Sequence, residues 1–286
     1  MVIKQTYIVP ALNEAVRFEA FAMQVVTEIS SKKGIQKAIR RGELLLNGNK
    51  VSTGTWLKEG DRIDWMEKLE PFTPVEIDMP VVYEDDHLAV VNKPAGIVVS
   101  GNKQRTVLHA LPLLLRKTER IDALPYPLPI HRLDYATSGL LVVAKTRSAH
   151  LHLSRQMESR SIEKQYQAIV CGKLSGKREF NAPIEEKKAI TRFQVVKQID
   201  SVKFKQLSLV QIDLLTGRTN QIRIHFSENG TPVLGDQKFG EEAHRIKGKG
   251  MFLCACWLRF MHPETQTAIE LSISPPAKFD RVMAKV

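Results

Sequence analysis

The chain has 286 residues, of which 43% are apolar and 26% are charged. This mix is typical of globular proteins and excludes collagen-like and intrinsically disordered classes, and the length allows one large and one small domain. The apolar runs are much shorter than the ~18 residues that span a bilayer. The first residues lack a signal-peptide pattern, and the three cysteines make no disulfide framework. We therefore expect a cytoplasmic protein that does not associate with a membrane.

Basic residues outnumber acidic residues by 42 to 31, which gives a net charge of +11. Residues 1–80 contain 11 of each, so the whole surplus lies in residues 81–286. A surplus of this size favours a polyanionic partner such as RNA. A merely soluble basic surface gives the same sum, so charge alone leaves both interpretations open.

The first 66 residues have the pattern of a small mixed domain. Apolar residues recur at helical spacing in residues 14–29, and residues 35–41 predict a second, short helix. Residues 43–46 and 61–65 predict strands, and the turn Asn47-Gly48-Asn49 follows the first of them. Three prolines within residues 67–80 then predict a linker, so that a larger domain begins at residue 81 and continues to residue 286.

The second predicted helix and its approach carry five basic side chains with no acid between them. This cluster predicts an RNA-binding face, although a solvated helix surface explains the same pattern. Its members are Lys32, Lys33, Lys37, Arg40 and Arg41.

The order of these elements resembles the αL RNA-binding domain of the ribosomal-protein type, which occurs on many RNA-modifying enzymes. The resemblance rests on GELLLNGNKV (residues 42–51) and KEGDRIDW (residues 58–65), which follow the two predicted helices. It implies that residues 1–66 form an RNA-binding module. Residues 17–19 are Arg-Phe-Glu where that family often has Arg-Leu-Asp.

From residue 81 onward, strand patterns alternate with helical ones. Helices are predicted for residues 147–160 and 220–228. The pattern indicates an α+β domain whose sheet is mixed and mostly antiparallel. Predicted strands, rich in Val, Ile and Leu, occupy residues 81–83, 88–92, 140–145, 166–171, 190–196 and 207–214.

Two sequence strings contain candidate catalytic groups. In PIHRLDYATSGLLVVAK (residues 129–145), prolines stiffen the approach to Asp134, which precedes a buried strand. In LLTGRTNQIRIHF (residues 214–226), Arg218 and Arg223 stand where a strand gives way to a helix, a junction that suits an anionic ligand. Each string also has a structural interpretation: Asp134 caps a turn and pairs with Arg132, and the second string is a charged helix start.

Together these strings closely resemble the RluA-type family of RNA pseudouridine synthases. That family has an H-R-L-D-x-x-T-S-G-L-L segment and, far downstream, T-G-R-T-H-Q-I-R-V-H. The resemblance extends in order over residues 81–276. It also includes YEDDHLAVVNKPAGIVV (residues 83–99), EKQYQAIVCG (residues 163–172), PVLGDQKFG (residues 232–240) and LCACWLRFMHP (residues 253–263).

The resemblance assigns roles to individual residues. It makes Asp134 the catalytic aspartate, Tyr166 the tyrosine stacked against the target base, and Arg218 the arginine paired with the aspartate. Leu253 would pack under the base. The other residues expected to contact the substrate are His131, Arg132, Gln221, Arg223 and Lys93.

The chain departs from the family pattern at a few positions. Asn220 and Cys254 each replace a histidine, and Phe239 replaces a tyrosine. Tyr135 stands where a basic or acidic residue is frequent. None of the four is a proposed catalytic group, so these departures bear on RNA contacts and hence on the choice of substrate.

The expected activity is the isomerisation of specific uridines to pseudouridine in structured rRNA or tRNA. A flipped-out uridine loses its glycosidic bond and is rejoined through carbon, and an ionised Asp134 suits the cation-like or eliminated sugar of this reaction. We expect a monomer with no cofactor and no metal. A zinc site is not expected because the pairs His150/His152 and Cys254/Cys256 lack its further ligands. Two alternatives stay open: a non-catalytic RNA-binding or ribosome assembly factor, and an RNA uracil glycosidase.

Overall fold

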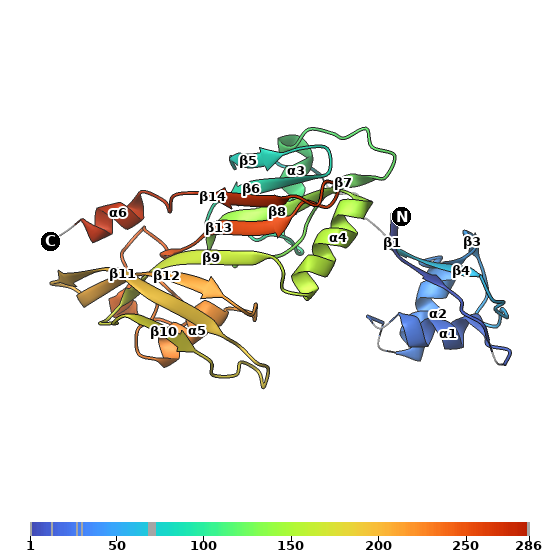
Figure 1. Cartoon of the computed structure of the whole chain (residues 1–286), viewed down its shortest axis with the longest axis horizontal. Helices are drawn as coiled ribbons and strands as arrows, with labels where there is room; N and C mark the ends of the chain where they lie inside the picture. Colours follow the sequence, from blue (N-terminus) through green and yellow to red (C-terminus); the bar gives the residue numbers. More distant parts are fainter. Residues whose placement is uncertain (1, 13, 27, 30, 68–72, 285–286) are drawn as a thin grey trace. The chain divides into compact units, whose positions relative to one another are not determined.

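The computed structural model describes residues 2–12, 14–26, 28–29, 31–67 and 73–284 (Figure 1). The chain divides into two compact units, Met1–Phe72 and Thr73–Val286. Within the described ranges, no helix is long and apolar enough to cross a membrane.

Unit 1 packs two helices against a four-stranded sheet. Its strands lie in the order β1-β4-β2-β3, and every pair of neighbours is antiparallel. Phe18, Ile35, Leu44 and Ile63 are fully buried in the shared core. The elements are β1 (Val2–Ile8), α1 (Phe18–Val25), α2 (Lys32–Arg41), β2 (Leu44–Leu46), β3 (Asn49–Lys50) and β4 (Arg62–Glu67).

The turn after β2 lies at the predicted position, although Asn49 begins the short strand β3 instead of completing the turn. Asn47 and Gly48 have positive φ angles of 50° and 80°, the backbone geometry that a two-residue turn between antiparallel strands requires and that these residue types tolerate. The first helix ends at Val25 and begins later than expected, at Phe18, because Arg17 is extended and pairs with Trp56. Strand β1 was not predicted; it borders β4 at the edge of the sheet.

Helix α2 presents the basic cluster to solvent. Its five cations are all exposed, whereas Ile35, Ala38 and Ile39 are buried on the opposite side. Lys32 lies 3.4 Å from a Glu19 oxygen and Arg41 lies 3.6 Å from a Glu43 oxygen. The remaining members of the cluster are Lys33, Lys37 and Arg40, none of which has an ion pair within the described part of the chain.

Unit 2 is built on a large mixed sheet, as the sequence predicts. The strand order is β10-β11-β12-β9-β13-β8-β6-β5, with β14 beside β13 and β7 beside β8. All neighbouring strands are antiparallel except β13 and β8. The strands are β5 (Val81–Glu84), β6 (Leu88–Lys93), β7 (Ala123–Pro129), β8 (Ser138–Thr146), β9 (Glu163–Cys171), β10 (Lys177–Phe180), β11 (Thr191–Ser201), β12 (Lys205–Leu214), β13 (Leu253–Met261) and β14 (Ala268–Ser272).

Glycine at position 139 permits the close parallel pairing of β8 and β13. Its φ is +121°, and a Cβ atom there would lie 2.2 Å from the Ala255 carbonyl oxygen. Because no other residue type fits this gap, Gly139 holds the start of β8 against the start of β13. The loop before β8 therefore ends beside Leu253.

Helices cover the sheet of unit 2. The elements are α3 (Val107–Leu114), α4 (Arg147–Glu158), α5 (Gln221–Glu228), a short 3₁₀ helix η1 (Glu242–His244) and α6 (Lys278–Met283). Helix α3 was not predicted, because it contains Pro112. The Thr106 hydroxyl accepts a hydrogen bond from the His109 N–H at its start, and burial of Val107 and Leu111 stabilises it despite the proline.

The predicted linker, residues 67–80, lies partly outside the described residues, which omit 68–72. Its second half packs onto unit 2, because Ile77 and Met79 are only 7% and 2% exposed within that unit's core. Residues 73–80 therefore belong to unit 2 rather than to a free connector.

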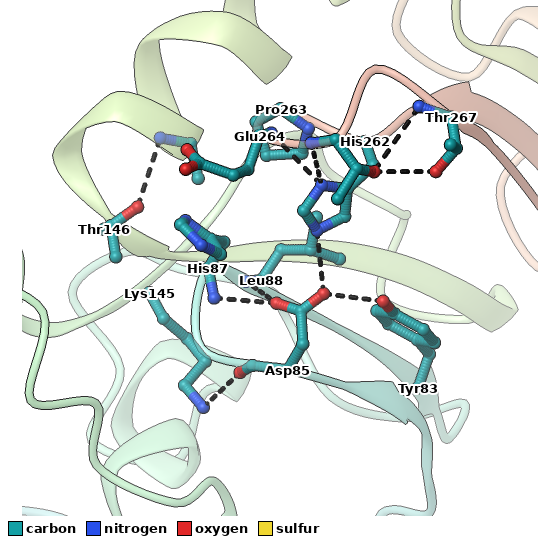
Figure 2. A network of polar contacts seen from close by, with 12 residues as sticks. Tyr83, Asp85, His87, Leu88, Lys145, Thr146, His262, Pro263, Glu264 and Thr267 are labelled. Carbon is teal, nitrogen blue, oxygen red and sulfur yellow. Dashed lines mark hydrogen bonds and ion pairs between the residues drawn. The ribbon is translucent and has the colours of Figure 1, made fainter.

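An Asp85-centred network ties two turns of unit 2 together (Figure 2). The Asp85 carboxylate accepts hydrogen bonds from the Tyr83 hydroxyl at 2.6 Å and from His262 Nε2 at 2.8 Å. His262 Nδ1 accepts from the backbone N–H of Thr265 at 3.0 Å, so the imidazole carries its proton on Nε2. Lys145 Nζ donates to the Asp85 carbonyl at 2.6 Å. These contacts connect the β5–β6 turn with the β13–β14 turn.

Candidate active site

A cavity of about 280 Å³ opens where four segments of unit 2 converge. These are the loop before β8, the start of β9, the start of β13 and the loop before α5. The central position of β9, β13 and β8 in the sheet brings the segments together. The predicted site residues that line the cavity are His131, Arg132, Asp134, Tyr166, Arg218, Gln221, Arg223 and Leu253.

Asp134 reaches the cavity from a tight turn just before β8. Its carbonyl oxygen accepts a hydrogen bond from the Thr137 N–H at 3.1 Å, which closes the turn. The side chain is 22% exposed, so water and a ligand can both reach it. One carboxylate oxygen lies 3.2 Å from Nη1 of Arg223. The turn therefore holds an accessible carboxylate beside a fixed cation.

Arg223 is the arginine that contacts Asp134. Its Nε and Nη2 donate to the two oxygens of Asp236 at 2.7 and 2.8 Å, and Nη1 also donates to Asn220 Oδ1 at 2.6 Å. Burial alone would lower the pKa of Arg223, but hydrogen bonds and charge from Asp236 and Asp134 raise it above its ordinary value. The guanidinium is therefore always charged and held in one orientation by several partners.

The expected pair between Arg218 and Asp134 is replaced by this arrangement. Arg218 lines the cavity, but its Nε donates to the Lys188 carbonyl at 3.1 Å. Arg223 lies on the first turns of α5, where its side chain can reach both Asp134 and Asp236. The sequence string contained both arginines, and only the start of α5 at Gln221 decides which one faces the carboxylate.

Tyr166 and Leu253 form apolar walls of the cavity. They come from adjacent strands β9 and β13, and their side chains are 6% and 3% exposed. Burial, followed by the negative charge of Asp134, raises the pKa of the Tyr166 hydroxyl, which therefore stays protonated at neutral pH. A flat, apolar group that enters the cavity meets the Tyr166 ring on one side and the Asp134 carboxylate nearby.

Two residues expected to contact the substrate have structural roles instead. Gln221 is 2% exposed, and its amide is occupied by Thr216, Arg218, Ile190 and Thr191. It therefore fixes the loop before α5.

Lys93 is fully buried and lies outside the cavity lining. Its Nζ donates to the carbonyls of Pro94 and Ile97 at 2.9 and 2.8 Å. Burial lowers the pKa of Lys93 to about 8, against the opposing effect of the Asp134 charge. Its link to the site is therefore electrostatic, since no contact joins Lys93 to Asp134 among the described residues.

His131 and Arg132 differ in their availability to a ligand. His131 Nε2 accepts a hydrogen bond from the Val142 N–H at 3.2 Å, and burial lowers the pKa of His131 to about 3. The imidazole is therefore neutral and engaged with β8. Arg132 is exposed at the cavity and has no polar partner in the described ranges.

Sequence reasoning missed three contributions to the site. Asp236 is 1% exposed and binds Arg223 with both oxygens. Its place within the PVLGDQKFG string was the available signal in the sequence. Phe239 lies under the Arg223 guanidinium at 5.0 Å. Asn220 has a positive φ of 56°, which asparagine tolerates, and its amide oxygen orients Arg223. Two of the departures from the family pattern therefore contact the central arginine.

The described residues contain no group of three or more His, Cys, Asp or Glu side chains that could hold a metal ion. Cys171, Cys254 and Cys256 are buried free thiols. Burial raises the pKa of Cys171 and of Cys256 to about 12, so these thiols are protonated at neutral pH.

Comparison with known proteins gives concordant matches over most of the chain. A protein from Aquifex aeolicus named "Uncharacterized RNA pseudouridine synthase" is 31% identical, with 94% of this chain and 93% of that protein covered. The chain belongs to the RNA pseudouridine synthase family. The family profile described as RNA pseudouridylate synthase matches residues 87–228, which include Asp134, Tyr166 and Arg223.

Further relatives agree with this assignment. A Xanthomonas campestris protein named "Ribosomal large subunit pseudouridine synthase D" is 30% identical, covering 97% of this chain and 91% of that protein. The solved structure titled "Human RNA Pseudouridylate Synthase Domain Containing 1" has a TM-score of 0.57 at 22% identity, covering 73% of this chain and 96% of that chain. The predicted α+β pseudouridine synthase fold is thereby confirmed, and the chain is an RNA pseudouridine synthase, an isomerase that modifies RNA.

Proposed function

We propose that this pseudouridine synthase modifies specific uridines in structured ribosomal or transfer RNA, with Asp134 as the catalytic carboxylate. The observation that carries the proposal is the position of Asp134 in an accessible cavity, 3.2 Å from Arg223 and facing the same space as the buried Tyr166. Ribosomal RNA is the first target to test, because relatives such as the Xanthomonas campestris protein are named for the large ribosomal subunit.

The reaction exchanges one bond to the sugar for another. The bond between C1′ and N1 of uracil breaks, the base turns, C5 bonds to C1′, and the hydrogen on C5 leaves as a proton while N1 gains one. An ionised Asp134 serves this sequence either by attacking C1′ or by removing a sugar proton, and it stabilises positive charge on the ring in both cases. Both routes require the carboxylate to be ionised.

Arg223 and Lys93 supply the positive charge that favours the ionised carboxylate. Arg223 contacts Asp134 directly, and its double contact with Asp236 prevents it from swinging away. Lys93 adds a second cation that interacts with Asp134 electrostatically from the buried side.

The detached base has to stay in the cavity until it is rejoined. Tyr166 and Leu253 enclose it with apolar surface, against which a uracil ring packs without losing a hydrogen-bond partner. Retention of the base separates an isomerase from a glycosidase, which releases it.

The target uridine has to leave its stack to reach this cavity, at a cost of a few kcal/mol. Arg132 is exposed at the cavity and free of partners among the described residues, so it is placed to enter the vacated stack. His131 is less suited to that role because Val142 occupies its Nε2.

Unit 1 is proposed to be the αL-type RNA-binding module, with the linker before unit 2. Lys33 and Lys37 on α2 are exposed cations with no carboxylate partner in the described ranges. They would bind phosphates near the target, while Lys32 and Arg41 already have glutamate partners.

The test compares Asp134→Asn with a matched control, Asp86→Asn, which makes the same change at an exposed aspartate of unit 2. RNA labelled with tritium at uracil C5, transcribed or isolated from cells lacking the protein, releases tritium when C5 bonds to the sugar. We expect no release with Asp134→Asn and normal release with Asp86→Asn. Mapping pseudouridines in RNA from cells with and without the protein identifies the target.

Three outcomes would contradict the proposal. Normal tritium release by Asp134→Asn would remove Asp134 from the chemistry. Free uracil in the reaction mixture would indicate an RNA uracil glycosidase. Identical pseudouridine maps with and without the protein would favour a non-catalytic RNA-binding factor.

A further inference from the structure

A second cavity of about 490 Å³ lies in unit 2 between the β11–β12 hairpin, the loop before β13 and α6. We call it the β12 pocket. Among the described residues that line it, none is Asp or Glu, whereas five are cations: Lys203, Lys247, Lys249, Lys278 and Arg281. Such a one-sided set of charges attracts an anion.

The floor of the β12 pocket is apolar and partly aromatic. Phe204 is partly exposed in it, and Phe252 is fully buried beneath it. Lys203 lies 5.1 Å from the Phe204 ring centre and Lys278 lies 4.4 Å from that of Phe252. A ligand that suits this pocket therefore combines negative charge with a flat apolar face.

The cations divide into fixed and available ones. Lys278 Nζ donates to the Met251 carbonyl at 2.7 Å and Lys203 Nζ donates to the Arg245 carbonyl at 2.7 Å, so these two lysines hold the walls. Lys247 and Lys249 are exposed, and their amino groups have no partner in the described part of unit 2. These two are the groups that an incoming phosphate would meet.

The β12 pocket is separate from the uridine cavity. Leu207 lines the first and Leu214 the second, and both lie on β12. Seven residues of strand span about 23 Å. A ligand in the β12 pocket therefore leaves the catalytic cavity free.

We propose that the β12 pocket binds a nucleotide of the RNA substrate remote from the target uridine. Its base stacks on Phe204, and its flanking phosphates bind Lys247 and Lys249. Stacking on an aromatic ring within a cationic groove is how proteins grip single-stranded RNA without reading its sequence. The proposal rests on the proposed function in one respect, that the polyanion this enzyme binds is RNA. Its consequence is a preference for RNAs with an unpaired segment at this spacing from the target.

The probe is fluorescein-labelled oligoadenylate of about ten nucleotides, which contains no uracil to isomerise, and the readout is its fluorescence anisotropy with the full chain. The variant Lys247→Ala/Lys249→Ala is compared with Lys117→Ala/Lys177→Ala, which removes two exposed lysines of unit 2 that do not line the pocket. Loss of two phosphate contacts should reduce the slope of log K against log salt by about 1.4. The control should leave the slope unchanged.

The stacking contact is tested separately at Phe204. Phe204→Leu keeps an apolar side chain and should weaken oligoadenylate binding about fivefold or more, whereas Phe204→Tyr keeps the ring and should bind like the wild type. Melting temperatures of both variants check that the fold is intact. Tritium release from a short hairpin substrate should be unchanged in all of these variants, because none of the residues lines the uridine cavity.

Several results would overturn the proposal. One is a salt slope that changes equally in the two double variants. Another is tight binding of Phe204→Leu. A third is lysine-dependent binding of phosphatidylglycerol vesicles or an oligoglutamate peptide with no binding of oligoadenylate. The experiments separate this proposal from the proposed function. A protein that binds oligoadenylate through Lys247 and Lys249 but has no isomerase activity would refute only the catalytic proposal.

Discussion

Replacing Arg223 by methionine tests the central ion-pair arrangement of the site. Methionine keeps the length and much of the apolar contact of the side chain but removes its contacts with Asp134, Asp236 and Asn220. The Asp236 side chain is 0% exposed, so the variant leaves a buried carboxylate without its counter-charge. Breaking such a pair costs about 3–5 kcal/mol. At about 2–4 °C per kcal/mol for a domain of this size, the melting temperature should fall by about 6–20 °C.

Arg218→Met serves as the matched control. Among the described residues, the Arg218 side chain has one hydrogen bond, to the Lys188 carbonyl, and it is less buried than Arg223. Its loss should cost about 1 kcal/mol and lower the melting temperature by about 2–4 °C. The contrast between the two variants follows from the tertiary structure, since both residues are arginines of the same sequence string.

The double variant Arg223→Met/Asp236→Asn separates stability from catalysis. It removes the unpaired buried charge, so most of the lost stability should return. Tritium release should stay at least about tenfold below wild type, because Asp134 still lacks the guanidinium contact that positions it, and a misplaced reactive group commonly costs about 100-fold in rate. Urea denaturation and the tritium assay on the same preparations supply both readouts. Wild-type stability and activity of Arg223→Met would refute the assignment and return Arg218 to the role that the sequence suggested.

Three further predictions concern charge. Burial lowers the pKa of Lys93 to about 8, so between about pH 8 and 9.5 the unfolded chain binds a proton that the folded chain does not, and the Lys93 contribution to the free energy of unfolding rises with pH. In urea denaturation, Lys93→Met should show a smaller rise in stability over this pH range than the wild type. An equal rise in both proteins would contradict the lowered pKa. Burial tends to raise the pKa of Asp85, but hydrogen bonds from Tyr83, the backbone and His262 lower it below its ordinary value. Its stabilisation is therefore present above about pH 4 and is lost as pH falls through the folded pKa. Asp85→Asn should flatten the stability curve below about pH 4, and an unchanged acid limb would refute this. Lys33→Ala/Lys37→Ala should reduce the salt slope for folded ribosomal RNA by about 1.4–1.8, measured by filter binding, and a slope equal to that of wild type would show that α2 does not contact phosphates.

Local signals in the sequence were sufficient for the framework of the protein. The hairpin at Asn47-Gly48 formed because these residues tolerate positive φ, and helix α4 and the central strands β6, β8, β9 and β12 formed where apolar periodicity indicated them. Strand β7 and helix α3 were missed because proline argues locally against each. Pairing with β8 holds β7, and burial of Val107 and Leu111 outweighs the local cost for α3.

The catalytic candidates Asp134 and Tyr166 were identified from linear motifs, because the chemistry of this family needs those residue types at those places in the chain. Only the tertiary structure decides which arginine pairs with Asp134 and which of the expected contacts are internal to the protein. Arg223 and Arg218 are chemically alike and five residues apart, so their roles depend on where α5 begins and on Asp236 arriving from a later segment. Sequence thus specified the candidate reactive groups, and packing between distant segments decided their partners, because contacts across the sheet leave no pattern in the local order of residues.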